Sequence, residues 1–160
     1  MVYSEANKEQ DYKSMGTTSV AAIILGDKVI IANVGDSRCY LWRDGEMTQL
    51  THDLSLVADL IRKGLLTEED AKTHPERSAV TRAMGSAETV EVDIITEKIQ
   101  AKDKILLCSD GLTTMLEDEE IAAVVTSGGS SKIESEKLIA LANEAGGYDN
   151  ITITLFEVEV

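Results

Sequence analysis

Short apolar runs separated by glycine–aspartate pairs dominate the first third of the chain. The runs are TTSVAAIIL (17–25), KVIIANV (28–34), SRCYLW (37–42) and MTQL (47–50). β-Branched and apolar residues bounded by pairs such as Gly26-Asp27 and Asp44-Gly45 predict β-hairpins. Hairpins this closely spaced predict antiparallel strands, because parallel strands need a longer crossover connection.

Apolar residues at helical spacing follow in the middle of the chain and again near its end. Two short helices are predicted over 55–64 and 66–74, with Ser55 and Thr67 as N-caps. Two further helices are predicted, one from near Leu116 and one over 132–145, with 128–131 as the linker between them. Strands are predicted over 89–99, 103–109 and 150–160, and residues 3–14 could be the end of a helix. This order of elements predicts one α+β domain over residues 1–160.

The composition supports a folded domain and argues against two classes of partner. The chain has 160 residues, of which 43% are hydrophobic and only 4% aromatic, so the core should be mainly aliphatic. The net charge of −14 argues against binding to nucleic acid or to an anionic membrane, because both need a cationic surface. No apolar run approaches the ~20 residues that a membrane helix needs. Cys39 and Cys108 lie in apolar runs and are expected to be inert core thiols in a cytoplasmic protein.

Three aspartates share one kind of position. Asp36, Asp110 and Asp149 each lie at the end of a predicted strand, beside small residues. A single aspartate next to glycine is typically a turn residue that caps local backbone N–H groups. Three of them at strand ends could instead converge at one sheet edge and bind Mg²⁺ or Mn²⁺, which prefer oxygen ligands. No Cys/His cluster supports zinc, and the two histidines, His52 and His74, are interpreted as loop residues.

Five short motifs occur in an order that resembles one enzyme family. They are Gly16-Thr17-Thr18, ANVGDSRCYLWRDGEMTQLTHD (32–53), VTRAMG (80–85), LLCSDGL (106–112) and GGYDNITI (146–153). Each motif is weak alone, but all five in sequence resemble bacterial members of the protein phosphatase 2C family. The resemblance implies an α-β-β-α sandwich, in which two antiparallel sheets are flanked by helices.

The resemblance also implies a chemistry. Members of the family are metal-dependent protein serine/threonine phosphatases, in which Mg²⁺ or Mn²⁺ activates a water for attack on phosphoserine or phosphothreonine. By the same resemblance, Asp110 and Asp149 are ligands of the first metal, and Asp36 with Asp110 holds a further, weaker metal. Residues 52–80 correspond to the flap beside the cleft. The substrate would be a phosphoprotein.

The sequence departs from the family pattern at two places. Asp53-Leu54-Ser55 stands where relatives commonly have Asp-His-Ser, which puts contacts of the flap in doubt. The family places a phosphate-binding Arg, a Glu-Asp pair and an Asp-Gly-x-Gly-Gly-His motif before Gly-Thr-Thr, and the residues before Gly16 contain none of these motifs. Glu5, Glu9 and Asp11 are present there, but in no matching motif. We therefore expect an N-terminally truncated family domain with impaired activity, and exposed sheet edges that favour homo-oligomers or strand exchange.

Three hypotheses follow from these observations. The first is a phosphatase catalytic domain with Asp36, Asp110 and Asp149 as metal ligands. The second is a non-catalytic pseudophosphatase or regulatory module that binds phosphoprotein or metal. The third is a structural acidic domain without metal, which three aspartates in matching motifs make the weakest of the three.

Overall fold

The computed structural model describes residues 2–8, 10–12 and 15–159. The helices are α1 (Val2–Ala6), η1 (Gln10–Tyr12, a 3-10 helix), α2 (Leu56–Arg62), α3 (Glu68–Lys72), α4 (Asp110–Thr113), α5 (Asp118–Val125) and α6 (Ser131–Glu144). The strands are β1 (Ser19–Leu25), β2 (Lys28–Val34), β3 (Arg38–Arg43), β4 (Glu46–Gln49), β5 (Asp93–Lys98), β6 (Lys104–Cys108) and β7 (Ile153–Glu157).

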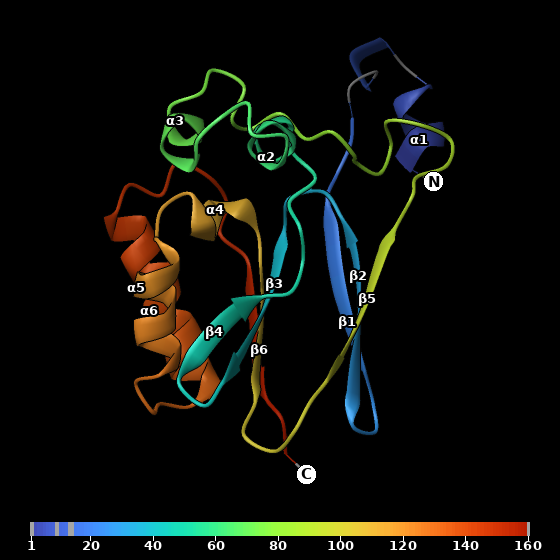
Figure 1. Cartoon of the computed structure of the whole chain (residues 1–160). Coiled ribbons are helices and arrows are strands. Elements are labelled where there is room, and N and C mark those ends of the chain that lie inside the picture. Colours follow the sequence, from blue (N-terminus) through green and yellow to red (C-terminus); the bar gives the residue numbers. More distant parts are fainter. Residues whose placement is uncertain (1, 9, 13–14, 160) are drawn as a thin grey trace.

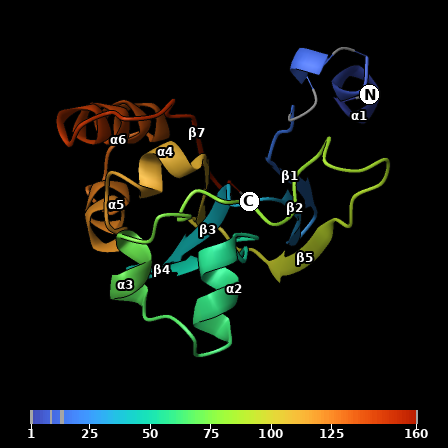
Figure 2. The same cartoon turned by 90° about the horizontal axis from the view of Figure 1, so that it is seen from above.

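The strands form two antiparallel sheets packed face to face (Figure 1). One sheet has three strands in the order β1-β2-β5, and the other has four in the order β4-β3-β6-β7. Helices α5 and α6 lie on the outer face of the four-stranded sheet, whereas no helix among the described residues covers the outer face of the three-stranded sheet. Helices α2 and α3 lie beyond one end of the sheets, on the side where α4 begins (Figures 1 and 2).

Two apolar clusters hold these layers together, and β6 contributes to both. Its alternate residues Ile105 and Leu107 face the cluster between the sheets, which also contains Val29, Ile31 and Leu41. Leu106 and Cys108 face the second cluster, which packs the four-stranded sheet against α4, α5 and α6. Every residue of β6 is buried, which explains why this strand is a continuous apolar run rather than an alternating one. The mainly aliphatic core matches the low aromatic content.

Most elements agree with the sequence prediction. The α+β class, the two antiparallel sheets and the order of elements are confirmed. The Ser55 hydroxyl accepts a hydrogen bond from the Ala58 N–H, and the Thr67 hydroxyl accepts one from the Asp70 N–H, so both predicted N-caps are confirmed. Both cysteines are free and buried, and burial raises the pKa of each thiol to about 12, as expected for inert core residues.

Three details differ from the prediction. Strand β5 begins at Asp93 rather than near residue 89, because its register with β2 ends at the pair Asn33–Asp93. The one-turn helix α4 follows β6 directly, although its Gly111 favours a loop. Near the N-terminus, α1 ends at Ala6 and a 3-10 helix covers Gln10–Tyr12. Residues 9, 13 and 14 of the predicted helical segment lie outside the described residues.

No helix in the described ranges is long and apolar enough to cross a membrane.

A buried ion pair links β6 to α6. The Lys104 ammonium donates hydrogen bonds to both Glu134 carboxylate oxygens, at 2.7 and 2.8 Å, and to the Val125 carbonyl at 2.9 Å. The side chains are only 7% and 1% exposed, so neither charge can be solvated if the other is removed. This pair therefore fixes α6 against the sheet.

We predict that Glu134→Leu lowers the free energy of unfolding by about 3–5 kcal/mol, because it leaves the Lys104 charge buried without a partner. The matched control is Glu136→Leu on the same helix, which removes only an exposed pair with Lys132 and should cost less than about 1 kcal/mol. Urea denaturation measures both changes. Equal midpoints for the two variants would contradict a structural role of the buried pair.

Candidate metal centre at one end of the sheets

The register of β3 with β6 brings the first two predicted site residues together. Arg38 is paired with Cys108 at the end of this ladder, and the two strands are antiparallel. Asp36 lies two residues before Arg38, and Asp110 lies two residues after Cys108, so continuing the register places them opposite each other. A pairing fixed by the apolar faces of the two strands therefore brings two carboxylates to the same sheet end.

A close backbone approach brings the third aspartate to the same end. A Cβ atom on Gly111 would lie 2.4 Å from the Asn150 carbonyl oxygen, so only glycine fits at this contact. The Ser109 hydroxyl donates a hydrogen bond to the same carbonyl at 3.1 Å and accepts one from the Thr152 N–H at 3.0 Å. Asp110 directly precedes Gly111, and Asp149 directly precedes Asn150. The two acids therefore flank a fixed contact between their loops.

The turn that carries Asp36 is held by the Gly-Thr-Thr motif. Gly35 has a φ of +105°, and a Cβ atom there would lie 2.3 Å from Thr18 Cγ2. The Thr18 and Ser37 hydroxyls are hydrogen-bonded at 2.9 Å. Thr17 forms an isolated antiparallel bridge with Met84, which lies in the VTRAMG motif. Motifs that are far apart in the sequence thus meet around this turn.

The electrostatics indicate mutual repulsion among the three carboxylates. Burial and, next, the negative charge of Asp110 raise the pKa of Asp36 above its usual value. Burial and the negative charge of Asp149 raise the pKa of Asp110 in the same way, although backbone N–H groups and Arg38 oppose the shift. The ionised acids are therefore held together at an energetic cost, which a bound cation would relieve.

The oxygen ligands at this sheet end fit a hard divalent cation, but the described residues do not supply a complete set of metal ligands. Carboxylate oxygens are the ligands that Mg²⁺ and Mn²⁺ prefer. Asp36 and Asp110 are half-buried, while Asp149 is exposed and its Oδ1 accepts a hydrogen bond from the Asn150 N–H at 2.6 Å. Among the described residues, no three His, Cys, Asp or Glu side chains are close enough to hold a metal ion by themselves. A cation bound by these acids would need further ligands or water.

The histidines contribute nothing to this site. His52 is exposed, and the Nδ1 atom of His74 accepts a hydrogen bond from the Glu76 N–H at 3.1 Å, which is a local turn contact. Both positions agree with the interpretation as loop residues.

The sequence prediction missed a network of side chains beside the acids. Arg38 donates three hydrogen bonds to the Asp53 carboxylate, from Nε at 2.9 and 3.0 Å and from Nη2 at 2.7 Å. Its Nη1 donates to the Tyr40 hydroxyl at 2.9 Å, and that hydroxyl donates to Asp118 at 2.9 Å. Burial alone would lower the pKa of Arg38, but the hydrogen bonds and charge of Asp53 raise it. The Gly-Asp-Ser-Arg motif contained Arg38, but nothing in the sequence indicated its partners.

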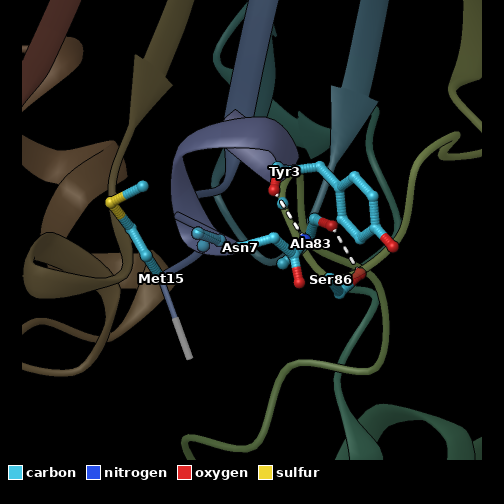
Figure 3. A pocket seen from close by; sticks show the side chains of 8 residues that line it. Tyr3, Asn7, Met15, Ala83 and Ser86 are labelled. Carbon is cyan, nitrogen blue, oxygen red and sulfur yellow. Dashed lines mark hydrogen bonds between the residues drawn. The ribbon is translucent and has the colours of Figure 1, made fainter. Parts of the chain in front are cut away.

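A pocket of about 480 Å³ lies apart from the acids, between α1 and the loop at 83–86 (Figure 3). Its lining includes Tyr3, Asn7, Met15 and Ser86, with no ionisable acid or base among the lining residues except the tyrosine. The Asn7 amide and the Ser86 hydroxyl donate hydrogen bonds to the carbonyls of Tyr3 and Ala83, so both point to their own backbone. The pocket therefore offers little that would hold a phosphate or a metal.

Comparison with known proteins defines the family. Residues 2–139 match the model of protein phosphatase 2C. The serine/threonine phosphatase stp of Listeria welshimeri is 45% identical over 152 residues, which cover 95% of this chain and 60% of that protein. Protein phosphatase PhpP of Streptococcus pneumoniae is 40% identical over 151 residues, which cover 94% of this chain and 61% of that protein.

Solved structures agree with this assignment. The S. agalactiae serine/threonine phosphatase matches with a TM-score of 0.93 at 44% identity, covering 99% of this chain and 65% of that chain. The catalytic domain of the serine/threonine protein phosphatase PstP, solved in complex with 2 manganese ions, matches with a TM-score of 0.85 at 33% identity, covering 96% of this chain and 63% of that chain.

The fold is thus that of the protein phosphatase 2C class, and the chain is a member of the protein phosphatase 2C family. It spans about 60% of the length of the curated relatives it matches.

We predict that Asp36→Asn stabilises the metal-free chain at pH 7, by less than about 1 kcal/mol because Asp36 is only partly buried. The folded-state pKa of Asp36 is raised, so its ionised form destabilises the fold above that pKa and the penalty disappears when the group is protonated. The advantage of Asn should therefore shrink as the pH falls. Thermal unfolding at several pH values measures it, with exposed Asp27→Asn as the control. If the Asp36→Asn variant unfolds at a lower temperature than the wild type, the proposed repulsion between Asp36 and Asp110 is contradicted.

Proposed function

We propose that this chain forms part of the catalytic domain of a metal-dependent protein serine/threonine phosphatase. In this proposal Asp36, Asp110 and Asp149 are metal ligands at the end of the sheets. The observation that carries the proposal is the convergence of these acids, which are brought together by the β3–β6 register and by the Gly111–Asn150 contact. The proposed substrates are phosphoserine and phosphothreonine in proteins, since the similar proteins are named serine/threonine phosphatases.

In the proposed mechanism, the main role of this chain is to hold a metal ion at the end of the sheets. When bound, Mn²⁺ or Mg²⁺ would lower the pKa of a water and neutralise charge on the phosphoryl group. Asp110 would be central, because the β3–β6 register sets it opposite Asp36 and the Gly111–Asn150 contact brings its loop to that of Asp149. Gly35 and Gly111 keep the acid-bearing loops close to their neighbours, so the ligands are positioned before a cation binds. Residues 52–80 would act as the flap beside the site.

The activity of residues 1–160 by themselves is proposed to be low. In the part of the chain that the structure describes, no three potential ligands are close enough to hold a metal alone, which supports weak metal binding. The same observation supports the alternative function, a regulatory module that binds a phosphoprotein or metal without catalysis. The two free cysteines support the proposal that the protein works in a reducing compartment such as the cytoplasm.

We predict that the chain hydrolyses p-nitrophenyl phosphate slowly with millimolar Mn²⁺, and that Asp110→Asn lowers the rate by at least about tenfold. The reason is that Asp110 is proposed to contribute to every metal position at this sheet end. Asp27→Asn, which changes an exposed acid at a hairpin turn, serves as the control. If neither the wild type nor Asp110→Asn hydrolyses p-nitrophenyl phosphate, the proposal of an enzyme is rejected for this chain and the regulatory function is favoured.

We also propose that two copies of the chain associate through β1. This strand is an edge of the three-stranded sheet and contains no charged residue, although the chain carries a net charge of −14. On the outer face of the sheet, Ile23, Leu25 and Ile94 are 61%, 58% and 63% exposed. An uncharged edge strand beside an exposed apolar face favours pairing with a second copy. Because β1 carries no charge of its own, pairing two copies there brings no like charges of the strand together.

The prediction is that the chain forms dimers at tens of micromolar and that Ile23→Lys shifts it to monomer, because a lysine on an edge strand opposes pairing. Light scattering measures the mass. Ile133→Lys on α6 is the matched control, since Ile133 is equally exposed at 60% but lies outside the sheets. A wild-type chain that is monomeric at this concentration would contradict self-association.

A further inference from the structure

Residues 55–80 form a lobe whose two ends are tied together at a narrow neck. Ser55 and Val80 form an isolated antiparallel bridge. On either side of it, the Leu56 N–H donates to the Ala79 carbonyl and the Thr81 N–H donates to the Leu54 carbonyl, both at 2.8 Å. Helices α2 and α3 lie within this lobe. Beyond the neck, an exposed ion pair between Lys72 of α3 and Glu117 at 2.7 Å also joins the lobe to the rest of the molecule. Because an exposed pair of this kind contributes little, the position of the lobe depends mainly on how the neck is attached.

The neck is attached to the turn that carries Asp36. The Leu54 N–H donates a hydrogen bond to the Gly35 carbonyl at 3.0 Å, directly beside Asp36. The neighbouring residue Asp53 receives the three hydrogen bonds from Arg38 and a fourth from the Gln49 amide at 3.0 Å. A single backbone hydrogen bond permits rotation, whereas a guanidinium bound to both carboxylate oxygens fixes an orientation.

Arg38 is held on its other side as well. Its Nη1 donates to Tyr40, and the Tyr40 hydroxyl in turn donates to Asp118 at the start of α5. Arg38 Nη1 also lies 3.8 Å from the Asp118 carboxylate. The guanidinium thus contacts Asp53, Tyr40 and Asp118, and it is not available to bind a substrate phosphate.

We propose that Arg38 is a positioning residue: its two-point contact with Asp53 fixes the neck of the 55–80 lobe against the turn of Asp36, so that the lobe and the acidic sheet end are held as one unit. The metal-binding part of this inference rests on the proposed function. Loss of the contact would loosen the neck and, through the Leu54–Gly35 hydrogen bond, the backbone on which Asp36 is carried.

The same strand offers a matched control. Arg43, at the other end of β3, also binds a carboxylate at two points, from Nε to Asp103 Oδ1 at 2.9 Å and from Nη2 to Asp103 Oδ2 at 2.6 Å, and its Nη2 donates to the Lys98 carbonyl as well, at 2.7 Å. The Asp103 carboxylate also accepts a hydrogen bond from the Gln100 N–H at 2.8 Å. Arg43→Lys therefore breaks a comparable two-point contact on the same strand, five residues from Arg38 and away from the acids.

The experiment compares Arg38→Lys with Arg43→Lys, because lysine keeps the charge and removes only the two-point geometry. Hydrogen–deuterium exchange should become faster by about tenfold or more at the amides of Leu54, Leu56 and Thr81 in Arg38→Lys only. Arg43→Lys should instead accelerate exchange at Gln100. The Mn²⁺ concentration that gives half of the maximal rise in unfolding temperature should increase roughly tenfold in Arg38→Lys and stay unchanged in Arg43→Lys.

Exchange at the neck that is equal in the two variants would overturn the proposal, and so would faster exchange with an unchanged Mn²⁺ midpoint. If Mn²⁺ stabilises neither the wild type nor any variant, the metal site of the proposed function is rejected. The positioning role is then decided by hydrogen–deuterium exchange alone, and it stands only if exchange at the neck becomes faster in Arg38→Lys and not in Arg43→Lys.

Asp53→Asn breaks the same contact from the other side. It replaces Arg38→Lys if circular dichroism shows that the Arg38→Lys variant does not fold.

Discussion

The pairing of β3 with β6 is the constraint on which the rest of the structure depends. Strand β6 is buried on both faces, so a slip of one residue would exchange the side chains of the two apolar clusters. Packing therefore fixes the register, and the register sets Asp36 opposite Asp110. The position of the candidate site is thus a consequence of core packing and not of any attraction between the acids.

The acids themselves oppose this arrangement. Burial, together with the charge of Asp110, raises the pKa of Asp36, and burial, together with the charge of Asp149, raises the pKa of Asp110, so the folded chain holds these acids close at a cost. Glycines at positions 35 and 111 allow the close approaches that keep the loops in place, and the buried Lys104–Glu134 pair anchors the helical layer behind the sheet. A local conflict supported by well-packed surroundings is typical of functional sites.

Much of this molecule could be predicted from sequence, and the exceptions have physical causes. Local sequence signals predict the hairpin turns, the helix caps Ser55 and Thr67, and from their order the α+β class. The structure confirms each of these predictions. The three acids stand out in the sequence because each lies next to an apolar strand, Asp36 and Asp110 after one and Asp149 before one. The partners of Arg38 are not predictable in this way, because Asp53 and Asp118 lie 15 and 80 positions from it and only the tertiary fold brings them together. The predicted start of β5 is wrong because β5 runs antiparallel to β2, and its first residue is set by the last paired residue of β2, Asn33.

By our proposal, the strand register creates one cation site from acids that are distant in sequence. Amide NMR spectra recorded with substoichiometric Mn²⁺ test it most directly, because the paramagnetic ion broadens signals of nearby residues. We expect broadening centred on residues 35–37, 109–111 and 148–150. Broadening spread over other acidic segments, such as the first turns of α3 and α5 with Glu68–Asp70 and Asp118–Glu120, would contradict it.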